Sequence, residues 1–405
     1  MHGILAHSTH SVEMVGSSNG GALAGLRVIE SATMIAAPLC GMMLADHGAD
    51  VIKVEMPGAG DTLRSWGHAK NGSGLTWKML GRNKRAVELD LRTPAGKATF
   101  LELLATADVY IENFRPGTLD KWGLTGEVMR AAKPDLIIAR ISGFGQTGPK
   151  SPLPGFGTLA EAMSGFAYIN GWPDKPPTLP SFSLADSIAG MAAAYGVLAA
   201  IHHRDKTGVG QDVDVALYEP LLTVLGSLIM DYQQLGIVQN RTGNLIPFTA
   251  PRNAYETQDG KWIAVSCSTQ ATTQRLFDAI EMPQLMADPR YCDNASRVIN
   301  IESLDAFIVA WFKNHAHDDA LAVLDRFGVT AGPVYSSADL FHDEHVRARG
   351  SIVPVHDDEL GELWMQAPVP RLTATPGSIR FTGRARVGAD TAEVLAELGR
   401  TGEQS

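Results

Sequence analysis

Asp186 is the residue of this sequence best placed to do chemistry. It follows residues 180–185 and stands directly before a very apolar stretch, 188–201, which predicts a buried helix. A helix N-terminus keeps a carboxylate ionised, and apolar surroundings remove its water, so it becomes a stronger nucleophile. The position also suits an ordinary N-cap, which contributes about 1 kcal/mol. On the sequence alone the N-cap is the stronger interpretation, and the two roles are compatible.

A GxGxxG pattern at residues 143–148 follows a predicted strand, as a dinucleotide site requires. The third glycine should open a helix, but Pro149, Pro152 and Pro154 follow it, and a helix cannot run through them. No acidic residue closes a second strand about 20 residues further on. A NAD-dependent dehydrogenase is therefore disfavoured, and the pattern predicts a glycine-rich active-site loop.

The cysteines and histidines indicate neither a disulfide framework nor a metal site. Cys40, Cys267 and Cys292 lie far apart without CxxC spacing, which fits a reducing cytoplasm. His315 and His317 stand beside two aspartates, but no matching ligand cluster lies nearby in the sequence, so a surface turn is the better interpretation. We expect no bound metal and no tightly bound cofactor.

The composition is that of a folded soluble protein. The chain has 405 residues, of which 45% are hydrophobic and 19% charged, and its net charge is −10. Its length predicts two or three domains, and its acidity disfavours nucleic acid or an anionic membrane as a partner. The stretch 188–201 is shorter than the roughly 20 residues that span a bilayer. Residues 1–21 lack the basic and apolar regions of a signal peptide and are expected to form a flexible tail.

Strands alternate with helices from residue 22 to about 215. Short apolar runs predict strands at 27–30, 51–55, 108–111, 136–141 and 212–217, and periodic runs predict helices at 37–46, 94–106 and 126–132. Such alternation is typical of βαβ units and a parallel sheet. We therefore expect a doubly wound, Rossmann-like α/β large domain over residues 22–224.

The pattern changes after residue 218. One long helix is predicted at 218–235, a strand at 261–266, and mostly helix from there to 328. These elements predict a smaller α+β domain over residues 225–330. The C-terminal segment, 331–405, carries a predicted strand at 352–355 and a helix at 391–398.

Ordered motifs over residues 22–405 resemble those of the family III CoA-transferases, a group that includes formyl-CoA transferase, carnitine CoA-transferase and the 2-methylacyl-CoA racemases. The motifs are LADHGADVIKVE at 44–55, GAGD at 58–61, RNKR at 82–85, LDLRTP at 89–94, IENFRPG at 111–117, GFGQTGP at 143–149, LAD at 184–186 and GVGQDVDVALYE at 208–219. So many matches in the same order make the resemblance specific.

The resemblance implies that CoA, as substrate and product, moves from an acyl-CoA to a small carboxylic acid. Asp186 stands where the family has its nucleophilic aspartate, which forms an aspartyl anhydride and then an aspartyl-CoA thioester. Family habit favours succinyl-CoA or a similar short acyl-CoA as donor and a dicarboxylic acid as acceptor. The positions that match CoA-binding residues are Met34, Ala36, Leu89, Arg92, Asn113, Phe114 and Lys121.

Three residues of the expected substrate pocket depart from relatives within the family. Ile35 replaces a glutamine of formyl-CoA transferase, and Phe156 and Gly157 replace a tyrosine and a glutamate, which disfavours an oxalate/formate exchange. Phe156 also stands where the racemases have a histidine, and phenylalanine cannot move a proton. Racemisation of a 2-methylacyl-CoA is the disfavoured runner-up.

The resemblance further implies an interlocked homodimer in which each chain is a ring threaded through the other. The C-terminal segment would return to the large domain, and the active site would lie between the large domain of one chain and the small domain of its partner. A non-catalytic subunit of a heteromeric transferase is the remaining alternative, and the presence of Asp186 argues against it. A cytoplasmic location is expected.

Overall fold

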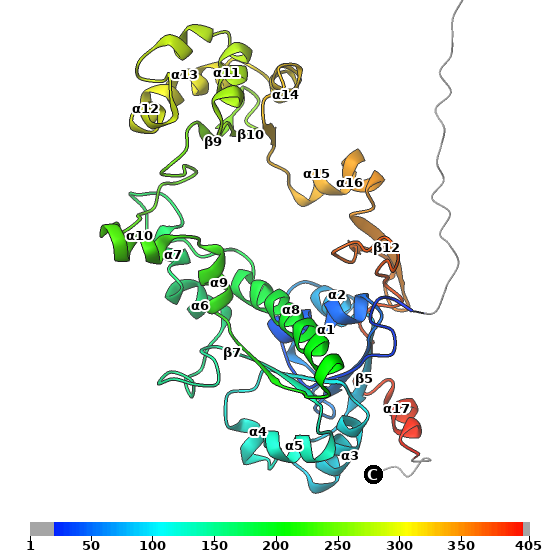
Figure 1. The fold of residues 1–405 in the computed structure, drawn as a ribbon. Coiled ribbons are helices and arrows are strands. Elements are labelled where there is room, and N and C mark those ends of the chain that lie inside the picture. Colours follow the sequence, from blue (N-terminus) through cyan, green and yellow to red (C-terminus); the bar gives the residue numbers. More distant parts are fainter. Residues whose placement is uncertain (1–19, 400–405) are drawn as a thin grey trace, which may run out of the picture.

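The computed structural model describes residues 20–399, so the predicted tail at 1–21 lies outside it except for its last two residues. Its centre is a sheet of six strands in the order β5-β2-β1-β6-β7-β8, and every pair in it is parallel. Figure 1 shows helices on both sides of this sheet. The strands are β1 (Arg27–Glu30), β2 (Asp50–Glu55), β5 (Lys84–Glu88), β6 (Val109–Glu112), β7 (Ile137–Ser142) and β8 (Asp212–Ala216). The predicted parallel α/β sheet is confirmed. The sequence analysis missed β5, whose Lys-Arg start hides its apolar pattern.

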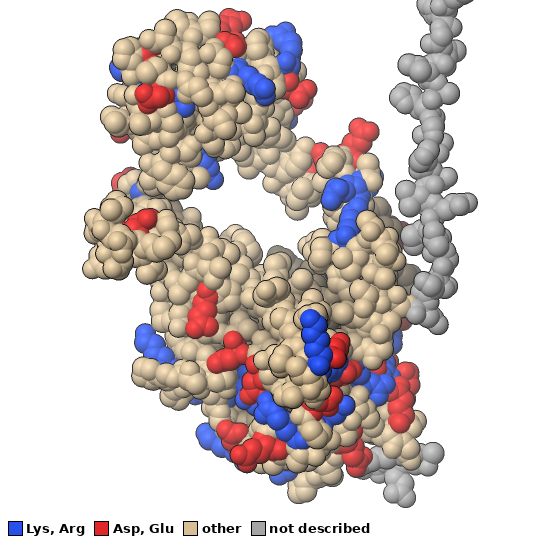
Figure 2. All heavy atoms as spheres, in the orientation of Figure 1, with Lys and Arg blue, Asp and Glu red and all other residues tan. Residues whose placement is uncertain are grey.

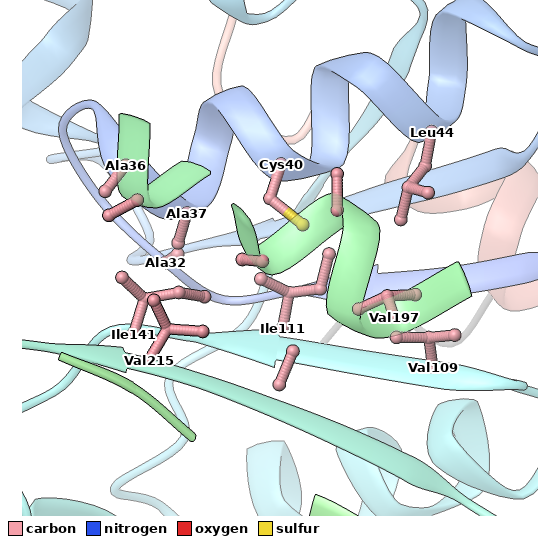
Figure 3. Packing of buried hydrophobic residues seen from close by; sticks show 14 of the residues in the cluster. Ala32, Ala36, Ala37, Cys40, Leu44, Val109, Ile111, Ile141, Val197 and Val215 are labelled. Carbon is pink, nitrogen blue, oxygen red and sulfur yellow. The ribbon is translucent and has the colours of Figure 1, made fainter. Parts of the chain in front are cut away.

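Helices cover both faces of this sheet because neighbouring strand residues point to opposite sides. Val28 packs with α1 (Ala36–Asp46) and α8 (Leu184–Thr207), whereas Ile29 packs with α3 (Pro94–Ala105) and α5 (Gly126–Ala132). Figure 3 shows α1 and α8 side by side above the strands. The buried face of α8 carries mostly alanines, and a Cβ on Gly190 would lie 2.5 Å from the Ala36 carbonyl oxygen. Small side chains therefore bring α1 and α8 into close contact.

Helix α8 is also the one helix, among the described residues, whose length and apolar composition would suit a membrane span. It packs against α1, β7 and β8 in the structure. Its alanine-rich face belongs to the main hydrophobic core. These contacts identify α8 as a core helix, as the sequence predicted for 188–201.

A second body has its own antiparallel sheet, in the order β11-β10-β9, and its own core. Its elements are β9 (Arg252–Glu256), β10 (Trp262–Ser266), α11 (Gln270–Ala279), α12 (Asn294–Ile299), α13 (Ile301–Lys313), α14 (His317–Arg326) and β11 (Ala331–Pro333). The chain connects the two bodies twice, before β9 and after β11. The space-filling view shows an opening between the two bodies and their connections (Figure 2).

The C-terminal segment packs on the body that holds the six-stranded sheet. It contains the hairpin β12 (Ile352–Asp357) and β13 (Gly361–Gln366), and α17 (Thr391–Glu397). Lys78 of α2 (Leu75–Leu80) pairs with Asp357 at 2.9 Å, and Arg82 donates to the Gln366 carbonyl at 2.7 Å. Asp390 accepts the Ala86 N–H at 2.7 Å, so the last helix is anchored to β5.

Two helix predictions were wrong in detail. The single helix predicted at 218–235 is two helices, α9 (Glu219–Val224) and α10 (Leu228–Leu235), because Gly226 adopts a φ of 73° between them. Asp186 is not an N-cap. Helix α8 begins at Leu184 after the N-cap Ser183, which places Asp186 inside the first turn.

A buried network of charges joins β1, β2 and β5. Lys53 donates to Glu30 at 2.9 Å, to Asp61 at 2.8 Å and to the Ala32 carbonyl, and Lys84 donates to Glu30 at 2.8 Å. Burial by itself would lower the pKa of Lys53, but Glu30 and Asp61 raise it above its ordinary value. Two ammonium groups thus balance two carboxylates, and all four side chains are buried.

Lys53→Met should destabilise the protein by about 3–5 kcal/mol, because it leaves Asp61 and part of Glu30 without a cation in the interior. Urea unfolding followed by circular dichroism measures the loss. The matched control is Lys175→Met, which removes a lysine whose side chain is 64% exposed and should change stability by less than about 0.5 kcal/mol. A loss below about 1 kcal/mol for Lys53→Met would show that the network is not a structural requirement.

Candidate active site

A cavity of about 520 Å³ opens at the carboxyl ends of β1, β6 and β7. The strand order reverses between β1 and β6, and ligands of parallel α/β sheets bind at such a reversal. The loop after β1 supplies Thr33, Met34 and Ile35 to the wall, Asn113 follows β6, and Ser142 ends β7. Residues from α6 (Gly157–Met163) and the start of α8 complete the cavity.

Asp186 lies half-buried in the wall of this cavity. A Cβ on Gly157 would lie 2.4 Å from Asp186 Oδ2, so the carboxylate rests against backbone that has no side chain. Burial raises the pKa of Asp186, and the negative charge of Glu161 adds to this, to about 6. Asp186 is thus a carboxylate with little water around it and with raised basicity.

Glu161 is a second carboxylate in the same cavity, and the sequence analysis missed it. Its side chain is 3% exposed, and Oε1 accepts the N–H of Ala185, the residue before Asp186, at 3.2 Å. Its signal in the sequence is weak: a single glutamate between alanines, four residues after Gly157. One helical turn separates residues four apart, so Gly157 and Glu161 share the face of α6 that meets α8.

Two side chains hold the loop after β1 in its shape. Met34 has a φ of 65°, unusual for a residue with a side chain, and Asp61 Oδ1 accepts its N–H at 3.1 Å. Asn113 brackets Thr33, accepting its N–H at 2.9 Å and donating to its carbonyl at 2.7 Å. The network around Lys53 therefore extends through Asp61 to the cavity wall.

As predicted, the glycine-rich segment 143–148 does not open a helix. No helix lies between the end of β7 and the start of α6. Gly143 lines the cavity together with Gly155. A Cβ on Gly143 would lie 2.6 Å from the Gly155 Cα, so two backbone segments touch here. The segment forms part of the cavity wall and lacks the helix that a dinucleotide phosphate site needs.

The structure brings most of the predicted site residues together in one cavity. Those in its wall are Asp186, Met34, Ile35, Ala36, Asn113, Phe156 and Gly157. Further lining residues, which the sequence analysis did not single out as site residues, include Trp66, Thr158, Leu179, Ser181 and Phe182. They come from loops and helix starts whose local sequence shows no motif.

Four predicted CoA-binding residues lie outside the cavity wall, in the segments that follow β5 and β6. Arg92 is paired with Asp90 at 2.8 Å and its side chain is 57% exposed. Phe114 packs edge-on against Trp122, with ring centres 5.2 Å apart. Leu89 directly follows β5, and Lys121 ends the short helix α4 (Thr118–Lys121) with its side chain exposed.

The charges of the cavity wall are all negative in the described part of the chain. Asp186 and Glu161 are its ionisable residues, and neither lysine nor arginine lines it. Within residues 20–399 no three His, Cys, Asp or Glu side chains gather as metal ligands would. The arrangement suits a carboxylate nucleophile that attacks a neutral, activated carbonyl group.

Comparison with known proteins identifies the family of this chain. The model of CoA-transferase family III matches residues 23–391. Succinyl-CoA–D-citramalate CoA-transferase of Chloroflexus aurantiacus is 45% identical over 92% of this chain and 93% of its own length. The beta subunit of succinyl-CoA–L-malate CoA-transferase from the same organism is 42% identical over 94% and 95%.

Further relatives support the same family. Succinate–glutarate CoA-transferase of Agrobacterium fabrum is 35% identical over 93% of this chain and 95% of its own. The crystal structure of a CaiB/BaiF family protein from Brucella suis superposes with a TM-score of 0.83 at 33% identity, covering 94% of this chain and all of that one. The protein is a CoA-transferase, and the chain belongs to CoA-transferase family III.

Proposed function

We propose that this CoA-transferase moves CoA from succinyl-CoA to a small dicarboxylic acid, with Asp186 as the covalent nucleophile. The observation that carries the proposal is the position of Asp186, half-buried against Gly157 in the wall of the cavity. The named activities of the relatives, on citramalate, malate and glutarate, support the donor and the class of acceptor.

The reaction follows from the chemistry of a carboxylate. Asp186 attacks the thioester carbonyl and the C–S bond breaks. CoA thiolate is released, and an aspartyl–acyl anhydride forms. The thiolate then attacks the aspartyl carbonyl, and succinate leaves. The acceptor carboxylate attacks the resulting aspartyl-CoA thioester, the C–S bond breaks, and a second anhydride forms. The released thiolate attacks the acceptor's acyl carbon in this anhydride, which gives the new acyl-CoA and releases the Asp186 carboxylate. Anhydride and thioester are similarly activated, so the energy of the C–S bond is retained.

Each covalent intermediate would hydrolyse if water reached it, so the cavity must stay dry during the reaction. Trp66, Phe156 and Phe182 line the cavity and expose apolar rings that a bound acyl-CoA can cover. Phe156 carries no proton to exchange, which favours transfer over racemisation at this site.

We propose that CoA lies along the edge formed by the carboxyl ends of β1, β5 and β6. Met34, Ala36 and Asn113 would contact the pantetheine arm inside the cavity, and Leu89 and Phe114 would contact CoA further out. Arg92 and Lys121 would bind its phosphates, since charge-assisted hydrogen bonds to phosphate are the strong ones. The absence of cations from the described cavity wall supports this placement.

We further propose a cytoplasmic, interlocked homodimer, with a large domain at 22–224, a small domain at 225–330, and a C-terminal segment at 331–405 that returns to the large domain. The opening between the two bodies supports a ring through which a second chain passes. Exposed apolar side chains support a partner surface on α8 and α10; they are Met191, Tyr195, Ile229, Met230, Tyr232 and Leu235. The relatives named as alpha and beta subunits make a heteromer the alternative to be tested.

Asp186→Ala should abolish CoA exchange, by more than about 10³-fold, while CoA still binds, because only the nucleophile is lost. Chromatography of acyl-CoAs after incubation with succinyl-CoA and citramalate or malate measures the exchange. Borohydride trapping with intact-protein mass spectrometry should place the adduct on Asp186 in the unaltered protein. Asp174→Asn, a change of an exposed aspartate, is the control. Activity retained in Asp186→Ala would disprove the proposed nucleophile.

Gly157→Ala should reduce kcat by about 10²-fold, because the new methyl group must displace the Asp186 carboxylate by about 1 Å. Steady-state kinetics and a melting curve separate this effect from unfolding. Gly126→Ala is a matched control, since Gly126 is also the first residue of a helix and a Cβ there meets only arginine side-chain ends at 3.3 Å. An unchanged kcat for Gly157→Ala would argue against this position of the reacting carboxylate.

Interlocked rings cannot exchange subunits without opening, whereas ordinary dimers dissociate and mix. We expect light and isotope-labelled protein, mixed under native conditions, to show no mixed dimers by native mass spectrometry over a day. Mixed dimers should appear after joint unfolding and refolding. A monomer, or mixing within minutes, would exclude the interlocked assembly, and full activity of this chain alone would exclude the need for a second kind of subunit.

A further inference from the structure

Glu161 is a buried carboxylate that the reaction above does not use. It is 3% exposed, and it lines the same cavity as Asp186. Its Oε1 accepts a hydrogen bond from the Ala185 N–H at 3.2 Å, and this bond joins α6 to the first turn of α8. A carboxylate is costly to bury without a cation, and within residues 20–399 Glu161 forms no ion pair with a lysine or arginine.

We propose that Glu161 is the positioning residue of the nucleophile: its carboxylate fixes the start of α8 through the Ala185 amide, and its negative charge favours the steps in which Asp186 becomes neutral. The proposal rests on Asp186 as nucleophile. It adds a role in the reaction for a residue that never touches the reacting carbonyl group.

The charge argument follows from the balance of the reaction. Before attack, Asp186 and Glu161 are two anions in one poorly hydrated cavity, and they repel each other. When Asp186 forms the anhydride, the negative charge leaves with CoA thiolate; when it forms the thioester, the charge leaves with succinate. Acylation therefore relieves the repulsion, and the pair favours the covalent intermediate over the free carboxylate.

The other charged groups on elements packed against α8 already have partners or lie elsewhere. Arg140 of β7 pairs with Asp212 at 3.0 Å and Glu112 at 3.6 Å, and Asp46 of α1 binds Arg82. Asp214 of β8 accepts the Gln146 N–H, and Glu219 begins α9. Among the described residues, Glu161 is the one charged neighbour that acts on the pKa of Asp186, which burial and this charge together raise to about 6.

Glu161→Gln separates charge from position, because its amide oxygen can still accept the Ala185 N–H. In the unaltered enzyme kcat/KM should fall below about pH 6, where Asp186 becomes protonated. In Glu161→Gln this acidic limb should move down by about one pH unit, since removal of a like charge lowers the pKa of Asp186. The fraction of enzyme trapped as aspartyl-CoA at neutral pH should fall about tenfold.

Two further variants complete the experiment. Glu161→Ala should show the same shift of the acidic limb and a larger loss of kcat, because it also releases the Ala185 amide. Glu302→Gln, which changes an exposed glutamate of α13, should leave both readouts unchanged. Melting curves show that the variants compared are folded.

An acidic limb and an adduct fraction that stay unaltered in both Glu161→Gln and Glu161→Ala would overturn the proposal, while adduct formation on Asp186 would leave the proposed function intact. Absence of any adduct on Asp186 in the unaltered enzyme would instead refute the proposed function itself. The two failures are therefore distinguishable.

Discussion

The buried ion network around Lys53 is the interaction on which the site depends. Lys53 lies in β2, yet it binds Glu30 of β1 and, through Asp61, the loop that carries Met34. Bonds from this one ammonium group to three oxygens connect β2 with β1 and with the loop at Asp61. The strained backbone at Met34 persists because these neighbours determine its position. The charged centre of the sheet thus determines the shape of the cavity wall at Met34.

Two glycines, which have no side chain, determine where the nucleophile lies. At Gly190, α8 approaches the Ala36 carbonyl, which sets the helix against α1, and at Gly157 the Asp186 carboxylate rests on bare backbone. At both glycines a polar oxygen occupies the space that the Cβ of any other residue would need. Its alanines alone would let α8 pack in many ways. Gly190 of α8 and Gly157 of α6 select one of these packing arrangements.

The sequence predicted the elements whose pattern is local and missed what depends on contacts between distant segments. Apolar runs located β1, β6 and β7, but β5 begins with two cations and has no such pattern. The prolines after Gly148 correctly predicted that the glycine-rich segment does not open a helix. Glu161 has no motif, because its importance comes from the meeting of α6 with α8. Similarly, the sequence made Asp186 look like an N-cap, whereas α8 begins two residues earlier, at Leu184.

The charge of the cavity also limits how substrates can lie in it. A dicarboxylic acid brings two negative groups, and one must meet Asp186 beside Glu161, where the described wall has no cation to offset it. The other group is repelled from this end of the cavity and is expected to lie toward the hydroxyl groups of Thr33, Ser142 or Ser181. Succinyl-CoA carries a free carboxylate as well, so the same repulsion acts on the donor and on the acceptor. We therefore expect both substrates to place their far carboxylate at the end of the cavity that carries these hydroxyl groups.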